Sequence, residues 1–242
     1  YPYTCYELLI RMEDSEEGLI LPGVFIPAAE RYALMPFIDL RNIHQSLEFL
    51  SKHQIDENTI FFINLSGQSI ASKDFYGSVN ELFEKYKINP KNICFEITET
   101  AVIANLDMAK RFINQFRQRG VYFALDDFGT GLSSFSYLKN LSVDFIKVDG
   151  EFAISMMDDV VSHAMVETTI RMGETVGITI VVECVETQET MTELIGLGAD
   201  YVQGYYVQKP LPLNEWESFD GTGFYAMEKT YINNRLGQVS VV

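Results

Sequence analysis

The chain contains little cysteine, few basic residues and no long apolar run. Its 242 residues include three cysteines. The number of cysteines is odd, and Cys5, Cys94 and Cys184 lie far apart in the sequence, each within an apolar run. Disulfide frameworks and zinc sites need paired or closely spaced cysteines, so this pattern argues against both. It predicts reduced core cysteines in a cytoplasmic protein.

Basic residues are scarce, because 18 Lys and Arg stand against 34 Asp and Glu, which makes the formal net charge −16. Binding to DNA or RNA needs a basic surface that neutralises phosphates, and docking on anionic lipid needs one too. The sequence therefore predicts neither kind of partner. If the ligand is itself anionic, bound divalent cations are the first candidates to attract it.

No stretch approaches the roughly 18 uncharged apolar residues of a membrane-spanning helix. The longest candidate, residues 18–29, is broken by Pro22 and Pro27. The first residues lack the basic region and the cleavage site of a signal peptide. We therefore expect a cytoplasmic domain without membrane contact of its own, which a longer protein could still anchor to a membrane.

Short β-rich runs alternate with longer segments of helical periodicity. The runs that predict strands are residues 5–11, 60–65, 93–98, 122–127, 145–149, 178–185 and 201–203. The segments with apolar residues at helical spacing are 37–50, 75–86, 108–116 and 165–176. This alternation predicts parallel βαβ units, and the nearly continuous apolar strands predict a sheet covered on both faces. No linker or low-complexity tract interrupts the pattern, so we expect one domain.

Polar residues lie within, or at the carboxyl end of, each predicted strand. They are Glu7, Asn64, Glu96, Asp126, Asp127, Lys147, Asp149, Glu183 and Gln203. A doubly wound sheet concentrates its ligands at one switch point, whereas a closed barrel gathers all its strand ends around one mouth. The sequence thus predicts an α/β fold, a TIM-like (β/α)8 barrel. Seven strands are visible where eight are needed, so we expect the first strand to be missing from this chain.

Several of these polar residues are hard oxygen ligands. Glu7, Asn64, Glu96, Asp126 and Asp127 suit Mg²⁺, Mn²⁺ or Ca²⁺ better than zinc or copper. The tandem aspartates could bridge or flank two ions. Any one such acid is more often a helix cap or a solvated loop residue, but that interpretation is poor for the whole set at successive strand ends.

Lys147 lies inside the apolar run 145–149, where an unpaired ammonium group would be costly to bury. It could lower the pKa of an attacking water or stabilise a developing charge, or it could form a structural ion pair with Asp149. Glu183 and Glu186 leave another apolar strand, and one of them could be a metal ligand or general base while the other anchors a loop.

A glycine-rich turn follows the tandem aspartates. Gly129 and Gly131 allow backbone conformations closed to other residues, so this turn could form a lid beside the metals. Gln203 offers a neutral polar contact to a substrate or a metal-bound water, although a glutamine before a glycine is more often a loop residue.

Taken in order, these residues resemble the EAL-domain family of cyclic di-GMP phosphodiesterases. The resemblance runs from about Tyr6 to about Pro212. The matching motifs are Glu7-Leu8-Leu9-Ile10-Arg11, Phe25 to Glu30, Asn64-Leu65-Ser66, Glu96 to Glu99, Asp126 to Gly131, Lys147-Val148-Asp149, Glu183 to Glu186 and Gln203-Gly204-Tyr205. Each motif alone is weak, but the full ordered set is highly specific.

The resemblance implies a barrel phosphodiesterase that cuts cyclic di-GMP to linear pGpG with two Mg²⁺ or Mn²⁺ ions and is inhibited by Ca²⁺. Carried over by position, the implied metal ligands are Glu7, Asn64, Glu96, Asp126, Asp127 and Glu183. The implied catalytic residues are Lys147, Glu183 and Asp149, and the implied substrate contacts are Leu9, Arg11 and Gln203. The residues implied to support the glycine-rich loop are Glu99, Glu186, Gly129 and Gly131.

The chain departs from the family pattern at three places. Cys184 stands where the family usually has Gly, Gly150-Glu151 replaces Arg-Ser, and Leu132 replaces Tyr. If the backbone at residue 184 needs a positive φ, a cysteine there costs roughly 1 kcal/mol and could displace Glu183. No metal ligand is lost, but the departures leave room for a slow enzyme.

The alternative function is therefore a slow or inactive EAL-type receptor for cyclic di-GMP, and a hydrolase of another phosphodiester is a third. The resemblance also implies an upstream sensory or GGDEF domain in a longer protein and leaves open a homodimer. We expect the barrel over residues 1–215 and a helix or packing tail of the same domain over residues 216–242. The residues that could form one apolar helix face in this tail are Phe224, Tyr225, Met227, Tyr231 and Ile232.

Overall fold

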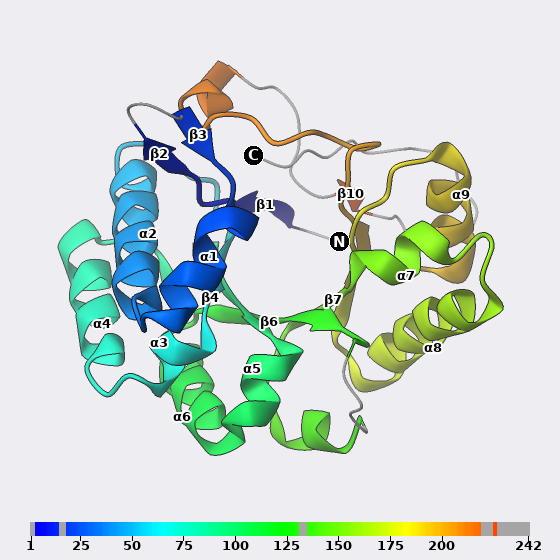
Figure 1. Cartoon of the computed structure of the whole chain (residues 1–242), viewed down its shortest axis with the longest axis horizontal. Coiled ribbons are helices and arrows are strands. Elements are labelled where there is room, and N and C mark those ends of the chain that lie inside the picture. Colours follow the sequence, from blue (N-terminus) through cyan, green and yellow to red (C-terminus); the bar gives the residue numbers. More distant parts are fainter. Residues whose placement is uncertain (1–2, 15–17, 131–134, 219–224, 227–242) are drawn as a thin grey trace.

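The computed structural model describes residues 3–14, 18–130, 135–218 and 225–226, and a curled sheet of eight strands forms its centre (Figure 1). In their order in the sheet, the strands are β1 (Thr4–Leu8), β4 (Thr59–Leu65), β5 (Ile93–Thr98), β6 (Tyr122–Phe128), β7 (Phe145–Val148), β8 (Thr179–Val182), β9 (Tyr201–Val202) and β10 (Tyr225–Ala226). Every neighbouring pair from β1 to β9 is parallel, while β10 is antiparallel to β9. The predicted barrel-like α/β fold is confirmed.

All seven predicted strands are present, with differences at their ends. β1 ends at Leu8 rather than at residue 11, and β8 ends at Val182 rather than at residue 185. At both places the chain leaves the sheet before the sequence pattern stops. The eighth strand of the sheet is β10, at the other end of the order from β1, and within the described residues no strand pairs with the outer edge of β1.

Helices cover the outer face of the sheet (Figure 1). The longer ones are α1 (Pro22–Arg31), α2 (Met35–Leu50), α4 (Phe75–Tyr86), α6 (Leu106–Arg117), α8 (Val160–Val176) and α9 (Gln188–Leu197). The shorter ones are α3 (Gly67–Ala71), α5 (Glu99–Ala104), α7 (Gly150–Ser155) and the 3₁₀ turns η1 (Pro90–Asn92), η2 (Phe135–Asn140) and η3 (Leu213–Ser218). The four predicted helical segments correspond to α2, α4, α6 and α8, each of which buries one apolar face. Within the described ranges, no helix is long and apolar enough to cross a membrane.

Apolar side chains are buried on both faces of the sheet. On the outer face, residues such as Phe61, Phe95 and Phe123 pack with the helices. On the inner face, the apolar layer consists of Cys5, Ile60, Phe62, Cys94, Ala124, Phe145, Val181 and Tyr201. This double burial explains why the strands read as nearly continuous apolar runs.

The three cysteines do not share one environment. Cys5 and Cys94 are fully buried in the inner layer, as the sequence predicts. Cys184 is exposed, so its prediction as a core cysteine is wrong. The reason is that β8 ends at Val182, and Cys184 lies in the turn that follows rather than in the apolar strand.

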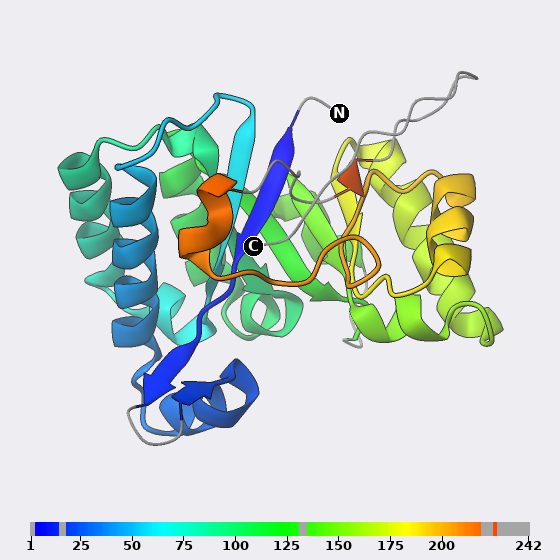
Figure 2. The same cartoon turned by 90° about the horizontal axis from the view of Figure 1, so that it is seen from above.

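An antiparallel hairpin that the sequence patterns do not indicate follows β1. Its strands, β2 (Met12–Asp14) and β3 (Gly18–Ile20), pair with each other and not with the main sheet. Together with α1 they project beyond the carboxyl end of β1 (Figure 2). The hairpin and α1 therefore lie at the end of the barrel that is formed by the carboxyl ends of the strands.

The end of the chain differs from the expected helix where it is described. Tyr225 and Ala226 form β10, so these two positions are strand and not helix, while residues 224, 227, 231 and 232 lie outside the described ranges. Earlier, Trp216 in η3 lies edge-on to Tyr6 and Phe61, with ring centroids 5.9 Å away in both cases. The segment around Trp216 thus packs against the outer face of β1 and β4.

Candidate active site

A ring of polar side chains lies directly beyond the inner apolar layer. Side chains alternate between the faces of a strand, so residues two apart share a face. The inward pairs are Cys5 and Glu7, Phe62 and Asn64, Cys94 and Glu96, Ala124 and Asp126, Phe145 and Lys147, Val181 and Glu183, and Tyr201 and Gln203. The second members of these pairs form the polar ring. Because the strands are parallel, the ring stands at their carboxyl ends, where barrel proteins place their functional sites.

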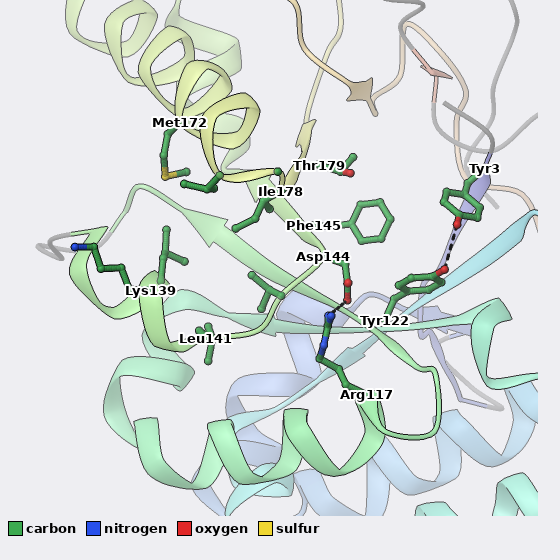
Figure 3. A pocket seen from close by; sticks show the side chains of 14 residues that line it. Tyr3, Arg117, Tyr122, Lys139, Leu141, Asp144, Phe145, Met172, Ile178 and Thr179 are labelled. Carbon is green, nitrogen blue, oxygen red and sulfur yellow. Dashed lines mark hydrogen bonds and ion pairs between the residues drawn. The ribbon is translucent and has the colours of Figure 1, made fainter.

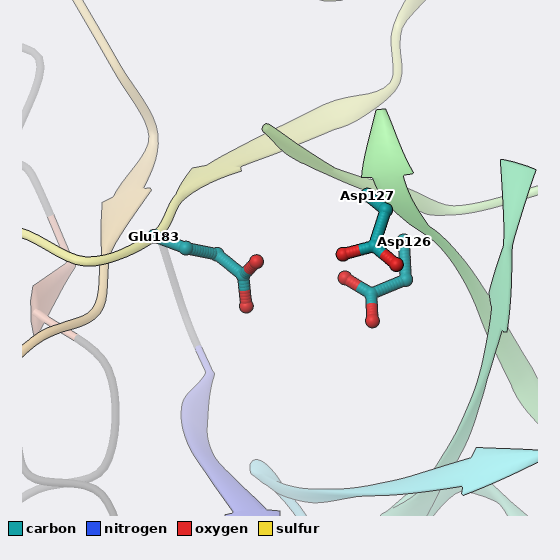
Figure 4. A group of neighbouring side chains, drawn as sticks. All are labelled: Asp126, Asp127 and Glu183. Carbon is teal, nitrogen blue, oxygen red and sulfur yellow. The ribbon is translucent and has the colours of Figure 1, made fainter. Parts of the chain in front are cut away.

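A β-bulge adds Asp127 to this ring. β6 pairs regularly with β7 as far as Leu125, and the register shifts before Phe128. Asp127 has a φ of 52°, in the left-handed region that aspartate tolerates better than most residues. Consecutive residues of a regular strand point to opposite faces, but the bulge lets both aspartates face Glu183. Each of the three acids offers an oxygen, and these oxygens lie within 4.8 Å of one another (Figure 4).

Lys147 is the one cation of the polar ring, and it is 1% exposed. Its Nζ lies 2.8 Å from Glu183 Oε1, 2.9 Å from Glu96 Oε1, 3.3 Å from Glu7 Oε2 and 3.6 Å from Asp126 Oδ1. Burial favours the neutral amine, but the four carboxylates outweigh it and hold the pKa of Lys147 well above its usual value. The ammonium group is therefore charged and fixed at the centre of the site.

Asp149 is not among the ion-pair partners of Lys147 in the described part of the chain. Its Oδ1 accepts a hydrogen bond of 2.7 Å from the backbone N–H of Glu151 and so caps the start of α7. The sequence allowed a structural ion pair between Lys147 and Asp149. In the structure Lys147 instead pairs with four other acids. The catalytic role that the resemblance implies for Asp149 stays a prediction.

Glu7 is held by three donors. Asn64 Nδ2 donates to Glu7 Oε1 at 2.7 Å, Gln203 Nε2 donates to Oε2 at 2.7 Å, and Lys147 also reaches Oε2. Burial alone would raise the pKa of Glu7, but the charge of Lys147 and these hydrogen bonds lower it below its usual value. Glu7 is therefore ionised, and strands β1, β4, β7 and β9 are tied together through one carboxylate.

The charge of Lys147 also lowers the pKa of the other acids of the site, but burial outweighs it. We call Glu7, Glu96, Asp126, Asp127 and Glu183 the acidic cluster. Burial, together with the neighbouring carboxylates, raises the pKa of Glu96 and Asp126, that of Asp127 to about 6 and that of Glu183 to about 8. With all groups ionised, five carboxylates and one ammonium carry a net charge of −4, which two divalent cations would neutralise.

Several oxygens of the acidic cluster have no hydrogen-bond donor. Both carboxylate oxygens of Glu96 and Oδ1 of Asp126 are buried and accept no hydrogen bond from the described residues, although Lys147 lies close by. Buried acceptors without a donor are costly unless another partner satisfies them. Hard, closely spaced carboxylate oxygens are the ligands that Mg²⁺ and Mn²⁺ prefer. The residues present therefore fit divalent cations.

The turn after β6 is fixed by Glu99, the first residue of α5. Glu99 is 2% exposed, its Oε2 accepts a hydrogen bond of 3.1 Å from the Gly129 N–H, and its Oε1 accepts one of 2.7 Å from the Tyr137 hydroxyl. Gly129 has a φ of 105°, which favours glycine. Gly131 lies outside the described residues, and Glu186 is exposed in the turn after β8. The contact of Tyr137 with Glu99 has no signal in the sequence, since it joins residues 38 positions apart.

Replacing Tyr137 with phenylalanine is expected to lower the free energy of unfolding by about 1 to 3 kcal/mol, because it leaves Glu99 Oε1 buried without its donor. Urea unfolding followed by circular dichroism measures the change. The matched control is Tyr32→Phe, which removes the same hydroxyl from a side chain that is 69% exposed. An equal, small effect of both substitutions would show that the Tyr137 hydroxyl does not stabilise the turn.

The implied substrate contacts Leu9 and Arg11 lie beyond the end of β1. Both line a cavity of about 610 Å³ between the start of the β2–β3 hairpin, α2 and residues 210–213. Arg11 Nη1 donates to the carbonyl of Ile10 at 2.8 Å, which holds the guanidinium close to its own backbone. Among the described residues that line this cavity, none belongs to the polar ring.

The backbone at Cys184 has a φ of 54°. This is the positive φ that is expected to be costly for a cysteine at this position. For a non-glycine residue this conformation costs roughly 1 to 2 kcal/mol. Glu183 nevertheless reaches Lys147. The strain is therefore present, and it does not remove Glu183 from the polar ring.

A second cavity lies at the opposite end of the barrel (Figure 3). It measures about 660 Å³ and lies at the amino ends of β6, β7 and β8. Four of its polar side chains pair with one another, because Arg117 pairs with Asp144 and the hydroxyls of Tyr3 and Tyr122 lie 3.2 Å apart. This end of a barrel usually serves stability, and the ion pair and the phenols fit that role.

The fold and the polar ring together define a class of protein, a β/α barrel with a cluster of carboxylates at the carboxyl ends of its strands. A family model described as the EAL domain matches residues 3–210. The chain therefore belongs to the EAL domain family.

Individual relatives agree with this membership. Cyclic di-GMP phosphodiesterase PdeB of Shewanella oneidensis is 36% identical over 216 residues, which are 88% of this chain and 25% of PdeB. MucR of Pseudomonas aeruginosa, a bifunctional diguanylate cyclase/cyclic di-GMP phosphodiesterase, is 30% identical and is matched over 88% of this chain and 32% of MucR. The chain thus spans about a quarter to a third of the length of these relatives.

Solved structures of relatives have the same fold. The PaMucR phosphodiesterase in complex with c-di-GMP superimposes with a TM-score of 0.81 at 29% identity, over 87% of this chain and 86% of that one. The Klebsiella pneumoniae BlrP1 calcium/cy-diGMP complex superimposes with a TM-score of 0.73 at 29% identity, over 84% of this chain and 50% of that one.

Proposed function

We propose that this chain is a metal-dependent phosphodiesterase that hydrolyses cyclic di-GMP to linear pGpG. The observation that carries the proposal is the acidic cluster around Lys147, in a chain whose relatives PdeB and MucR are cyclic di-GMP phosphodiesterases. Hydrolysis of a phosphodiester needs an activated water and neutralisation of the phosphate charge. A cluster that fits divalent cations is suited to both requirements.

The residues proposed to hold two Mg²⁺ or Mn²⁺ ions are Glu7, Asn64, Glu96, Asp126, Asp127 and Glu183. When bound, such ions lower the pKa of a water and offset the charge of the phosphates. Lys147 is proposed to hold an attacking water by hydrogen bonding, and its charge holds the acids together. Glu183 contacts Lys147 through Oε1, which leaves Oε2 to accept a proton. Leu9, Arg11 and Gln203 are proposed to contact the dinucleotide.

The direct test is to incubate the purified chain with cyclic di-GMP and Mg²⁺ or Mn²⁺ and to separate the products by chromatography. We expect pGpG with either ion and none with Ca²⁺, which is proposed to occupy the site without supporting turnover. Intact cyclic di-GMP after long incubation, with binding shown by calorimetry, would contradict the proposal and favour a receptor. Faster cleavage of another phosphodiester with an unactivated leaving group, such as a dinucleotide with other bases, than of cyclic di-GMP would favour another diester as substrate.

The metal-free protein is expected to become less stable as the pH rises. Asp127 and Glu183 have usual pKa values of 3.8 and 4.5, and the folded chain raises them to about 6 and about 8. The folded state therefore binds more protons than the unfolded state from about pH 4 to about pH 8, and stability falls across that window. Thermal unfolding in EDTA measures this fall.

Added Mn²⁺ is expected to reverse the loss, because it replaces the protons that the carboxylates release. At a hundredfold excess over its Kd it should add about 3 kcal/mol of stability at about pH 8, and clearly less at about pH 5, where protons compete. A Mn²⁺ effect that is equal at both pH values would show that these carboxylates do not bind the ion.

The proposal includes two features of the longer protein. The bifunctional relative MucR and the short share of each relative that this chain covers support a sensory or GGDEF domain in the same polypeptide. A homodimer is also proposed. Light scattering after size-exclusion chromatography checks it, and a monomeric mass across the accessible concentrations would contradict it.

A further inference from the structure

The turn after β8 changes its pairing partner from one residue to the next. The N–H of Glu183 donates to the Val148 carbonyl at 3.3 Å, on the β7 side, while the N–H of Val185 donates to the Gln203 carbonyl at 2.9 Å, on the β9 side. Cys184 lies between them with a φ of 54°. The left-handed residue is thus the point at which the chain turns away from β7, directly after Glu183.

The side chain of Cys184 occupies the space that a side chain at residue 150 would need. A Cβ added to Gly150 would lie 2.3 Å from Cys184 Sγ and 2.6 Å from Cys184 Cβ, which are both shorter than any tolerated contact. The Cβ of Cys184 is fixed by its own backbone, so a rotamer change cannot remove the second clash. Gly150 is the first residue of α7, whose start is capped by Asp149.

The two residues therefore connect the two strand ends that carry the central ion pair. Lys147 precedes Gly150 by three residues at the end of β7, and Glu183 immediately precedes Cys184. Lys147 Nζ and Glu183 Oε1 lie 2.8 Å apart. A change in the spacing between Gly150 and Cys184 shifts the turn that presents Glu183, and with it the distance between Glu183 and the tandem aspartates.

We propose that Cys184 and Gly150 form an interlocking pair that positions Glu183 for metal binding. This proposal rests on the proposed function of the site. The cysteine fills the space beside residue 150, and the glycine at residue 150 makes room for the cysteine. Cys184 and Gly150 are positioning residues and touch no reacting group.

The test is a double-mutant cycle read by Mn²⁺ affinity in titration calorimetry and by kcat for cyclic di-GMP. Gly150→Ala is expected to weaken Mn²⁺ binding about 10-fold to 100-fold, the range for residues that orient metal ligands. In the Cys184→Gly background, the same substitution is expected to cost less than about twofold, because the clash is gone. In the Cys184→Ala background the loss should be intermediate, since the Cβ contact remains.

Two further variants separate positioning from a general loss of structure. If the pair acts through Glu183, Gly150→Ala should change Mn²⁺ affinity little once Glu183→Gln is present. The matched control is Gly77→Ala in α4, where an added Cβ meets nothing within 4 Å and no change in affinity is expected. A Gly150→Ala protein that loses thermal stability but keeps its Mn²⁺ affinity and kcat would overturn the proposal.

The outcomes also separate this proposal from the proposed function. Equal losses from Gly150→Ala in the Cys184 and Cys184→Gly backgrounds, in a chain that hydrolyses cyclic di-GMP, contradict the pair alone. A chain that binds Mn²⁺ without hydrolysis contradicts the proposed function, while the Mn²⁺ affinities still decide on the pair. A chain that binds no Mn²⁺ contradicts both.

Discussion

Replacing Lys147 with methionine is expected to lower the free energy of unfolding of the metal-free protein by about 3 to 5 kcal/mol, the cost of removing one partner from a buried ion pair. The methionine fills most of the lysine volume, so the loss is electrostatic. Glu7, Glu96, Asp126 and Glu183 would then face one another without a cation. Urea unfolding in EDTA measures the change.

The loss should be larger at about pH 8 than at about pH 5, because protonation of the carboxylates relieves their repulsion at the lower pH. Lys139→Met is the matched control, because Lys139 is exposed and its substitution removes the same charge at the surface. It should change stability by less than about 0.5 kcal/mol. Equal effects of the two substitutions would show that Lys147 does not hold the acidic cluster together.

Replacing Glu183 with glutamine is expected to lower kcat for cyclic di-GMP about 10²-fold to 10⁴-fold, the range for removal of a group that moves a proton in the reaction. Glutamine keeps the size of the side chain but has no charge for a metal ion and no basic oxygen. It also weakens the contact with Lys147, which lies 2.8 Å from Glu183 Oε1. Steady-state hydrolysis measures kcat, and calorimetry with Mn²⁺ measures the loss of ligand charge.

The matched control for this substitution is Glu189→Gln. This substitution makes the same chemical change six residues further on. Glu189 lies in the first turn of α9 and is exposed. Its kcat and Mn²⁺ affinity should equal those of the unmodified chain. If Glu183→Gln keeps its kcat within a few-fold, Glu183 neither binds a required metal ion nor moves the proton.

The fold could be predicted from the sequence because its periodicities are local. The apolar runs that became β4, β5 and β6, and the helical spacing that became α4 and α6, record burial on both faces of a sheet and on one face of a helix. The antiparallel hairpin escaped prediction because each of its strands is only three residues long and carries no clear period. β10 escaped prediction because it lies in a segment whose apolar residues are also compatible with a helix face.

The identities of the ring residues were also visible in the sequence. A polar residue two positions after an inward apolar one, as in Cys94 and Glu96, follows from the alternation of a strand. Parallel strands bring such residues to one end of the barrel whatever the details of packing. Part of the excess of acidic residues in the chain therefore lies in the polar ring, where clustered carboxylates fit divalent cations.

Only the tertiary structure decided how these residues meet. The bulge that turns Asp126 and Asp127 to one side, and the four acids around Lys147 in place of Asp149, depend on contacts between strands far apart in the chain. The same is true of the exposed Cys184 that fills the space left by Gly150. The sequence alone determined which side chains face inward, because that depends on the period of each strand. Which of them touch depends on register and backbone conformation, and those are set by the packing of the whole barrel.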